Sequence, residues 1–253
     1  ISLYHSRRIG LSQGGMAVPL LVGAKLVGKI GERFTVGFLE VQTDDHQGRP
    51  ADNFGIFRLK RDLFSRSSVG LFLSNRQAEG GDYNRLIGID QNLVFFEHLT
   101  ITGTLAKSSS DGVDDKQWFG TFKGEWQDDL LRVGLDYSRV EENFASDIGF
   151  INRLGVRKIS PRIIISPRPK ISFIRQFQFG FWYDNYGRLD GTGLQSEQYH
   201  TILTTNFESG SQFRLPPHRQ TEDLQRPLRL PGGLVVPPGR YTWWLYPMTY
   251  QLN

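Results

Sequence analysis

Hydrophobic and polar residues alternate along much of the chain, and the segment 58–76, RLKRDLFSRSSVGLFLSNR, shows the pattern clearly. Leucines alternate with Arg58, Lys60 and Asp62 before the SRS turn, and apolar residues alternate with small or polar ones after it. A period of two is that of a β-strand, so the segment predicts a hairpin with one mostly apolar face and one charged face. Arg61 falls on the apolar face, where its long stem can reach lipid headgroups.

The same period predicts roughly twelve strands, and helical periodicity is nearly absent. Most predicted strands have about ten residues, whereas strands in globular proteins usually have about five or six. About ten residues suffice for a tilted strand to cross a bilayer. The predicted strands are 21–31, 33–43, 53–64, 68–76, 84–96, 99–108, 116–126, 130–140, 156–166, 170–183, 197–207 and 239–251.

Short connections alternate with long polar ones along the chain. GE, SRS, EH, QDD and PRP are short, whereas DDHQGRPAD, QAEGGDY, SSDGVDD, EENFASDIGFINRLG and DNYGRLDGTGLQSE are long. Outer-membrane barrels have tight turns at one end and long loops at the other. The Pro-rich stretch 208–238 breaks the alternation, and either contains a strand that the pattern does not reveal or leaves the sheet. We therefore predict an all-β, antiparallel transmembrane β-barrel with tight turns at one end and long loops at the other.

Composition narrows the class of protein further. The chain has 253 residues, 13% aromatic residues, a net charge of +4 and no cysteine, which excludes disulfides and thiolate metal sites. No apolar run is long enough for a membrane-spanning helix. The basic residues are dispersed, so we expect no nucleic-acid partner. The chain begins without a signal segment and ends within a predicted strand, so we expect residues 1–253 to be a partial barrel domain.

Charged residues on the polar face are the candidate lumen-facing positions. They can line a pore and tune what it admits, or they can pair and crosslink a filled barrel; the pattern leaves both readings open. Leu73 and Leu135 are predicted to lie on the opposite, apolar face, where arginine is expected to destabilise the protein strongly. Arginine at Ser74 or Gly134, on the polar face, is expected to destabilise it less. The lumen-facing candidates are Lys25, Lys29, Arg58, Lys60, Asp62, Asp90, Arg132 and Asp136.

Aromatic residues gather near the predicted strand ends. Amphipathic rings prefer the headgroup level of a bilayer, so these groups predict an interfacial girdle. The alternative is a platform on which sugar rings stack. The girdle candidates are Trp118, Trp126, Trp182, Tyr183, Trp243 and Trp244.

Signals for catalysis are weak. GLSQG, residues 10–14, matches the nucleophile-elbow spacing around Ser12, but no helix start follows it. DGVDD, residues 111–115, has acidic side chains for calcium without the full loop spacing. The five histidines lack zinc-ligand spacing. We therefore predict no enzyme activity, no metal and no cofactor.

Five blocks in order resemble a bacterial family of unknown function: YHSRRIG (4–10), PLLVGAKLVGKIG (19–31), RLKRDLFSRSSVGLFLSNR (58–76), DIGFINRLGVRKISP (147–161) and RPLRLPGGLVVPPGRYTWWLY (226–246). Members of this family are predicted outer-membrane β-barrels that usually follow a carbohydrate-binding module of the family-nine type. The resemblance implies a fold and an outer-membrane location but no established activity. The N-terminal module of the family is absent from this chain.

The expected function is passage or uptake of a polar solute, with carbohydrate as a candidate, through an outer-membrane barrel. The expected partners are the lipid bilayer and either carbohydrate or another envelope protein. The first alternative is a structural barrel subunit that anchors an envelope complex. A membrane-embedded hydrolase is the weaker alternative, because no triad or metal set is visible in the sequence.

Overall fold

The computed structural model describes residues 3, 9–11, 15–46, 48 and 50–253, and all of its regular elements are β-strands. No helix in these ranges is long and apolar enough to cross a membrane. The strands are β1 (Leu20–Ile30), β2 (Phe34–Thr43), β3 (Asp52–Phe64), β4 (Ser67–Ala78), β5 (Tyr83–Phe95), β6 (Leu99–Ser110), β7 (Trp118–Gln127), β8 (Leu131–Val140), β9 (Val156–Ile165), β10 (Ile174–Arg188), β11 (Leu194–Phe207), β12 (Gln212–Arg214), β13 (His218–Leu224), β14 (Leu228–Arg229), β15 (Val235–Val236), β16 (Gly239–Leu245) and β17 (Thr249–Gln251).

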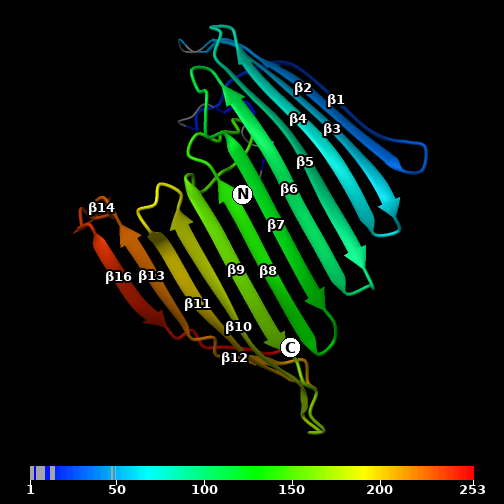
Figure 1. Ribbon diagram of the computed structural model, residues 1–253, viewed down its shortest axis with the longest axis vertical. Coiled ribbons are helices and arrows are strands. Elements are labelled where there is room, and N and C mark those ends of the chain that lie inside the picture. Colours follow the sequence, from blue (N-terminus) through cyan, green and yellow to red (C-terminus); the bar gives the residue numbers. More distant parts are fainter. Residues whose placement is uncertain (1–2, 4–8, 12–14, 47, 49) are drawn as a thin grey trace. The chain divides into compact units, whose positions relative to one another are not determined.

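The strands form one large sheet of fifteen strands and a separate two-stranded hairpin. In the large sheet β1 to β12 follow one another in chain order (Figure 1). Strand β17 pairs with β12, and β13 pairs with β11 and β16. Each pairing whose register is determined is antiparallel. No pairing among the described residues joins β1 to β17. The all-β antiparallel prediction is therefore confirmed, whereas a closed barrel is not found.

Tight and long connections alternate over the first nine strands, as predicted, with one exception. The links 31–33, 65–66, 96–98 and 128–130 are tight, whereas 44–51, 111–117 and 141–155 are long. Three predicted lengths are wrong. The link predicted as QAEGGDY comprises only 79–82, because its first two residues lie in β4 and its last in β5. Most of DNYGRLDGTGLQSE lies within β10 and β11, which leaves only 189–193 as a turn, and the link 166–173 is longer than its PRP signal suggested.

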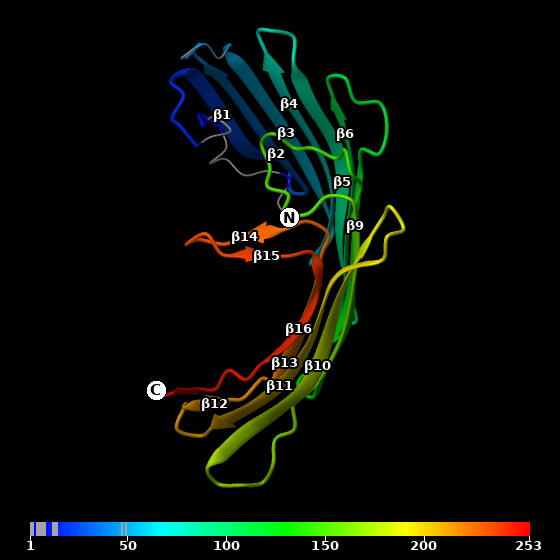
Figure 2. The same ribbon diagram turned by 90° about the vertical axis from the view of Figure 1, so that its left-hand side faces the viewer.

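The Pro-rich stretch both contributes strands and leaves the sheet. Its segments β12 and β13 pair with β11. Further along, β14 and β15 pair only with each other and form a hairpin apart from β13 and β16 (Figure 2). Short pairings such as these have too few residues to show a period of two, so the sequence pattern does not reveal them.

The described chain divides into two compact units. Unit 1 comprises Ile1–Val94, Ile101–Phe122 and Arg139–Val156, and unit 2 comprises Phe95–Thr100, Lys123–Ser138 and Arg157–Asn253. The single domain predicted for residues 1–253 stays a prediction.

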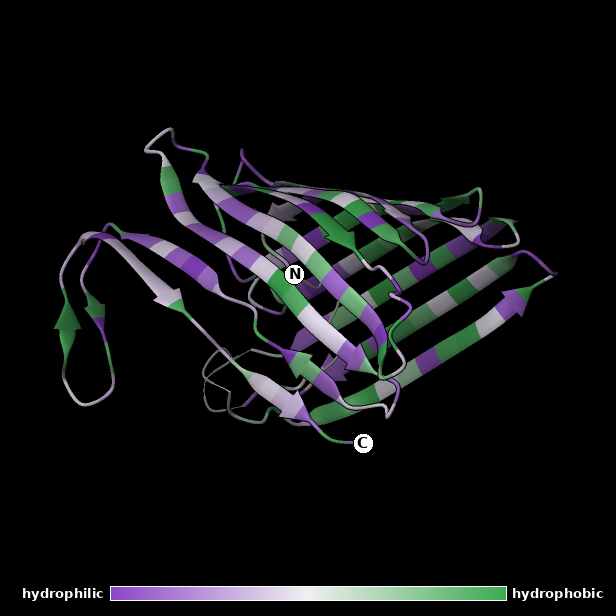
Figure 3. Cartoon of the chain, turned by 90° about the horizontal axis from the view of Figure 1, so that it is seen from below, coloured by the Kyte–Doolittle hydropathy of each residue, from purple (hydrophilic) through white to green (hydrophobic). Residues whose placement is uncertain are grey.

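Hydrophilic and hydrophobic residues alternate along many of the strands (Figure 3). Because successive side chains of a strand point to opposite faces, each unit presents two different sheet faces. We call the face of unit 1 that carries Arg58 and Asp90 its charged face, and the opposite one, with Leu59 and Ile89, its apolar face. In unit 2 the charged face carries Arg162 and the apolar face carries the neighbouring Ile163. The period-two prediction of two contrasting faces is confirmed by the registers of β1 to β5.

Part of the charged face of unit 1 is covered by the link between β8 and β9, residues 141–155, which we call the covering segment. Phe144 is 1% exposed and lies in a core with Leu86, Ala106 and Phe119, all from the charged face. Ile148, 2% exposed, packs with buried residues of β2 and β3. The prediction of a polar external loop at 141–155 is therefore wrong, since two of its large apolar side chains, Phe144 and Ile148, are buried.

Polar contacts hold the covering segment in place. The Ala145 amide donates to Ser108 Oγ at 3.1 Å, and the Asp147 amide donates to Asn84 Oδ1 at 3.1 Å. The Asp147 carboxylate also lies 3.0 Å from the guanidinium of Arg76. Arg76 is nearly buried and also contacts the carboxylates of Asp52, at the start of β3, and of Asp82, in the link 79–82. The charged face thus binds this segment through both apolar packing and ion pairs.

Candidate functional site

The charged face of unit 1 contains an ion pair that spans three strands. Arg58 on β3 donates two hydrogen bonds to Asp90 on β5, one of them at 2.8 Å from Nη2 to Oδ1. The strand between them contributes Gly70, which faces Lys60 and Asp90 in the register. A Cβ at Gly70 would lie 2.5–2.8 Å from the guanidinium. The missing side chain of Gly70 is therefore what allows Arg58 to reach Asp90.

Gly70→Ala is expected to displace Arg58 and lower the free energy of unfolding by about 1–2 kcal/mol, because a charge-assisted pair is lost from a partly exposed site. Urea unfolding of the protein in micelles measures this difference. Gly28→Ala is the control, since no atom lies within 4 Å of its Cβ position. In an Arg58→Ala background Gly70→Ala should cost nothing; an equal cost in both backgrounds would show that the strain lies elsewhere.

Unit 2 repeats this arrangement on its own charged face. Arg162 of β9 contacts Asp136 of β8 and, at 3.3 Å, Glu125 of β7. A Cβ at Gly134 of β8 would lie 3.4 Å from the Arg162 side chain. In the same unit Lys158 Nζ lies 2.9 Å from Asp184 of β10. In both units, then, an arginine on the charged face is paired with carboxylates of other strands.

The other lumen-facing candidates lie on the same face but form no common cluster. Lys60 pairs with Asp62 at 3.3 Å, and Arg132 donates to Gln127 Oε1 at 2.6 Å. By register Lys25 and Lys29 lie on the charged face of β1, where every residue is exposed. The registers place Lys25, Lys29 and Lys60 on the charged face of unit 1. That this face lines a lumen stays a prediction.

Ser74 and Gly134, the two positions expected to tolerate arginine, lie close to other side chains. Ser74 is only 9% exposed, and a Cβ at Gly134 would lie 3.4 Å from the side chain of Arg162. The milder effect of arginine at these positions stays a prediction.

A hollow of about 630 Å³ lies on the charged face of unit 1, within the size range of small-molecule sites. The Arg58–Asp90 pair lies at its wall, and Ile148 of the covering segment also contributes to it. Polar and apolar side chains are mixed around it, so it suits an amphipathic or hydrated occupant. Its other lining residues include Lys25, Val27, Thr35, Leu39, Ile56, Phe72, Thr102, Thr104 and Thr121.

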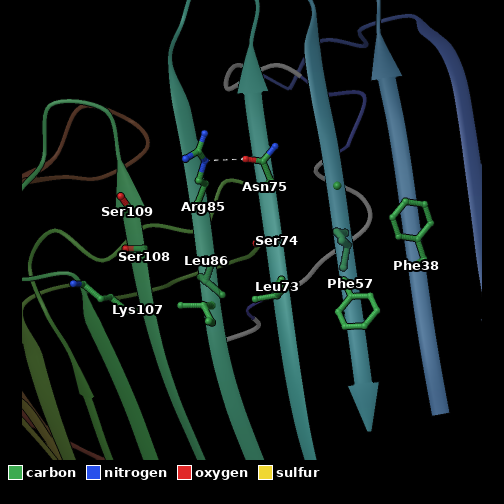
Figure 4. Close-up of a pocket in the computed structure, with 13 residues that line it drawn as sticks. Phe38, Phe57, Leu73, Ser74, Asn75, Arg85, Leu86, Lys107, Ser108 and Ser109 are labelled. Atoms are coloured by element: carbon green, nitrogen blue, oxygen red, sulfur yellow. Dashed lines mark hydrogen bonds between the residues drawn. The ribbon is translucent and has the colours of Figure 1, made fainter. Parts of the chain in front are cut away.

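The apolar face of unit 1 exposes large hydrophobic side chains in continuous cross-strand rows. Ile87 and Ile89 are 54% and 57% exposed. Phe38, Phe57, Leu73 and Ile87 form one row, and they border a shallow hollow of about 460 Å³ (Figure 4). Such an area exceeds the single apolar residues that are normal on a soluble surface, so it marks a surface for lipid or another protein.

Polar and aromatic residues lie at the margins of this apolar area. Figure 4 shows the next row, where Arg85 donates to Asn75 at 3.2 Å. The Arg85 guanidinium also lies 4.8 Å from the ring of Tyr83. Arg61, which the sequence pattern placed on the apolar face, lies at the opposite margin and is exposed. Its guanidinium lies 5.5 Å from the Phe34 ring. Cations beside aromatic rings at both margins suit the headgroup levels of a bilayer.

Four of the girdle candidates are exposed or lie on the apolar face of unit 2, and their place in a girdle stays a prediction. Trp118 is exposed, and Lys107 Nζ lies 5.6 Å from the centre of its ring. Trp126 is exposed, and its Nε1 donates a hydrogen bond to Asp128 at 3.0 Å. That hydrogen bond and those from the amides of the 130–131 turn lower the pKa of Asp128. Tyr183 and Trp244 lie on the apolar face of unit 2, as their registers show.

The other two girdle candidates, Trp182 and Trp243, lie on the charged face of unit 2. Trp182 pairs with His200, and Trp243 pairs with Gln220. Their assignment to the girdle is therefore corrected. The physical reason is the alternation of side chains: of two consecutive aromatic residues in a strand, only one can lie on the apolar face.

These two tryptophans belong to two adjacent cross-strand rows, which we call the aromatic–amide patch. One row contains Trp182, His200 and His218, and the next contains Asp184, Gln198, Gln220 and Trp243. The rings of Trp182 and His200 lie 4.3 Å apart, and those of His200 and His218 lie 5.3 Å apart. Sequence reasoning missed this patch because its members come from four strands, one of which it did not predict.

A catalytic or metal site finds no support among the described residues. They contain no group of three His, Cys, Asp or Glu side chains that could hold a metal. Ser12, the nucleophile-elbow candidate, lies outside them. The predicted absence of enzyme activity and of cofactors stays a prediction.

Comparisons with protein-family models, with curated proteins and with solved structures find no match. Function therefore has to be inferred from the residues and their geometry.

Proposed function

We propose that the chain forms part of the wall of a bacterial outer-membrane β-barrel that admits or takes up a polar solute along its charged face. The observation that carries this proposal is the contrast between the two faces. Long strands expose large hydrophobic side chains on one face and ion pairs on the other. Antiparallel strands of this kind span a bilayer only in a closed barrel, in which lipid contacts the apolar face.

Each charged face supports solute handling rather than an inert filling. That of unit 1 carries the hollow, and that of unit 2 carries the aromatic–amide patch, both with polar groups available at the surface. The pairs Arg58–Asp90, Lys158–Asp184 and Arg162–Asp136 neutralise part of the charge on these faces. The solute favoured by these features is polar and uncharged.

The second candidate is a structural barrel that conducts nothing. The covering segment favours it, because Phe144 and Ile148 fill part of the charged face of unit 1. Arg58–Asp90 and Arg162–Asp136 then act as crosslinks between strands.

Liposome swelling with arabinose distinguishes the two candidates. The protein is inserted into vesicles, insertion is checked by flotation, and swelling is compared with that of protein-free vesicles. Uptake predicts faster swelling with arabinose than with a large dextran. Insertion without swelling supports the structural candidate, and failure to insert contradicts both.

A further inference from the structure

We propose that the aromatic–amide patch of unit 2 is a binding site for a neutral oligosaccharide. This inference rests on the proposed function and names the class of its solute. It is carried by the juxtaposition of aromatic rings and side-chain amides on one face of β10, β11, β13 and β16.

The patch has the dimensions of a short linear ligand. Its second row crosses four neighbouring strands from Asp184 through Gln198 and Gln220 to Trp243. Since neighbouring strands lie about 4.8 Å apart, this row is about 14 Å long. Trp182 lies beside one end of the row and Trp243 forms the other, so an extended sugar chain can contact an indole at each end.

The chemistry of the patch matches that of a sugar. The C–H face of a pyranose ring packs on an aromatic ring, and its hydroxyls both donate and accept hydrogen bonds. Side-chain amides also do both. Gln198 Oε1 lies 2.9 Å from His200 Nε2, whereas Gln198 Nε2 and the Gln220 amide have no hydrogen-bond partner among the described residues. These amide groups are half-exposed and can therefore bind hydroxyls.

The charge of the patch argues against ionic ligands. Lys158 is the cation at its margin, and it is already paired with Asp184 at 2.9 Å and lies 5.3 Å from the Tyr186 ring. A phosphate or carboxylate ligand is usually recognised by an arginine fork or several free cations. A nucleotide would stack on the rings but would bring phosphates that find no such partner. A neutral glycan fits both the rings and the balanced charge.

Calorimetric titration of the full protein in detergent micelles tests the proposal, with maltohexaose, cellohexaose and xylohexaose as probes. We expect at least one probe to bind. Trp243→Ala and Gln220→Ala should each weaken its affinity by about tenfold, since each removes one stacking or hydrogen-bonding contact. Trp244→Ala is the matched control: it is the next residue on the same strand, lies on the opposite face and should leave the affinity unchanged.

Vesicle insertion and swelling are measured on the same preparations, so the two proposals can fail separately. Insertion and swelling without binding of any probe would overturn the glycan site and leave the proposed function standing. An equal loss of affinity in Trp243→Ala and Trp244→Ala would also overturn the site. Loss of affinity in Trp243→Ala but not in Trp244→Ala supports the site. If the protein shows this binding but does not insert into vesicles, only the proposed function is overturned.

Discussion

Phe144→Ala is expected to lower the free energy of unfolding by about 3–5 kcal/mol, the usual cost of truncating a buried aromatic side chain. Phe144 is 1% exposed, and its ring lies 5.3 Å from that of Phe119 in a stacked arrangement. Leu86 and Ala106 complete the same core, so a cavity would remain on the charged face. Denaturant unfolding followed by tryptophan fluorescence measures the change.

Phe150→Ala provides the control within the same covering segment, because Phe150 is 51% exposed. Its unfolding free energy should differ from that of the parent protein by less than about 0.5 kcal/mol, as for most surface substitutions. Similar small effects for both variants would show that the segment is a solvated loop, which the sequence pattern had suggested.

Leu105→Arg is expected to destabilise the membrane-inserted protein by about 2–4 kcal/mol, the cost of arginine on the lipid face near the middle of a bilayer. Leu105 lies near the middle of β6 and is 48% exposed on the apolar face. In water the same substitution at such an exposed site would change stability by less than about 0.5 kcal/mol. Folding titrations in vesicles therefore separate a bilayer surface from a solvated one.

Thr104→Arg is the matched control for this prediction. Thr104 precedes Leu105, lies on the charged face and lines the hollow, which has room for the longer side chain. The cost should be well below that of Leu105→Arg. Equal costs in vesicles would mean that the two faces do not differ in their surroundings.

The strands of the sheet were largely predictable from the sequence, because long segments with a period of two constrain both position and face. The segments 53–64 and 99–108, for example, correspond closely to β3 and β6. The covering segment was not predictable in this way. Only Phe144 and Ile148 in it are deeply buried hydrophobic side chains, and their partners come from strands far away in the chain.

The candidate site was predictable in its faces but not in its pairings. Alternation places Arg58 and Asp90 on one side of the sheet, but only the register shows that Gly70 lies between them. The same limit applies to Trp182 and Trp243. Aromatic clustering drew attention to them, whereas the neighbours that make them a candidate sugar site belong to other strands.

The most direct test of the central claim is whether the apolar face contacts lipid. Because the chain has no cysteine, Leu105→Cys and Thr104→Cys each provide a single labelling site for an environment-sensitive fluorophore. The label is measured in vesicles that contain lipids with a nitroxide on the acyl chain. The account predicts strong quenching at position 105 and little at position 104. Equal quenching at both positions, or none at position 105, would contradict it.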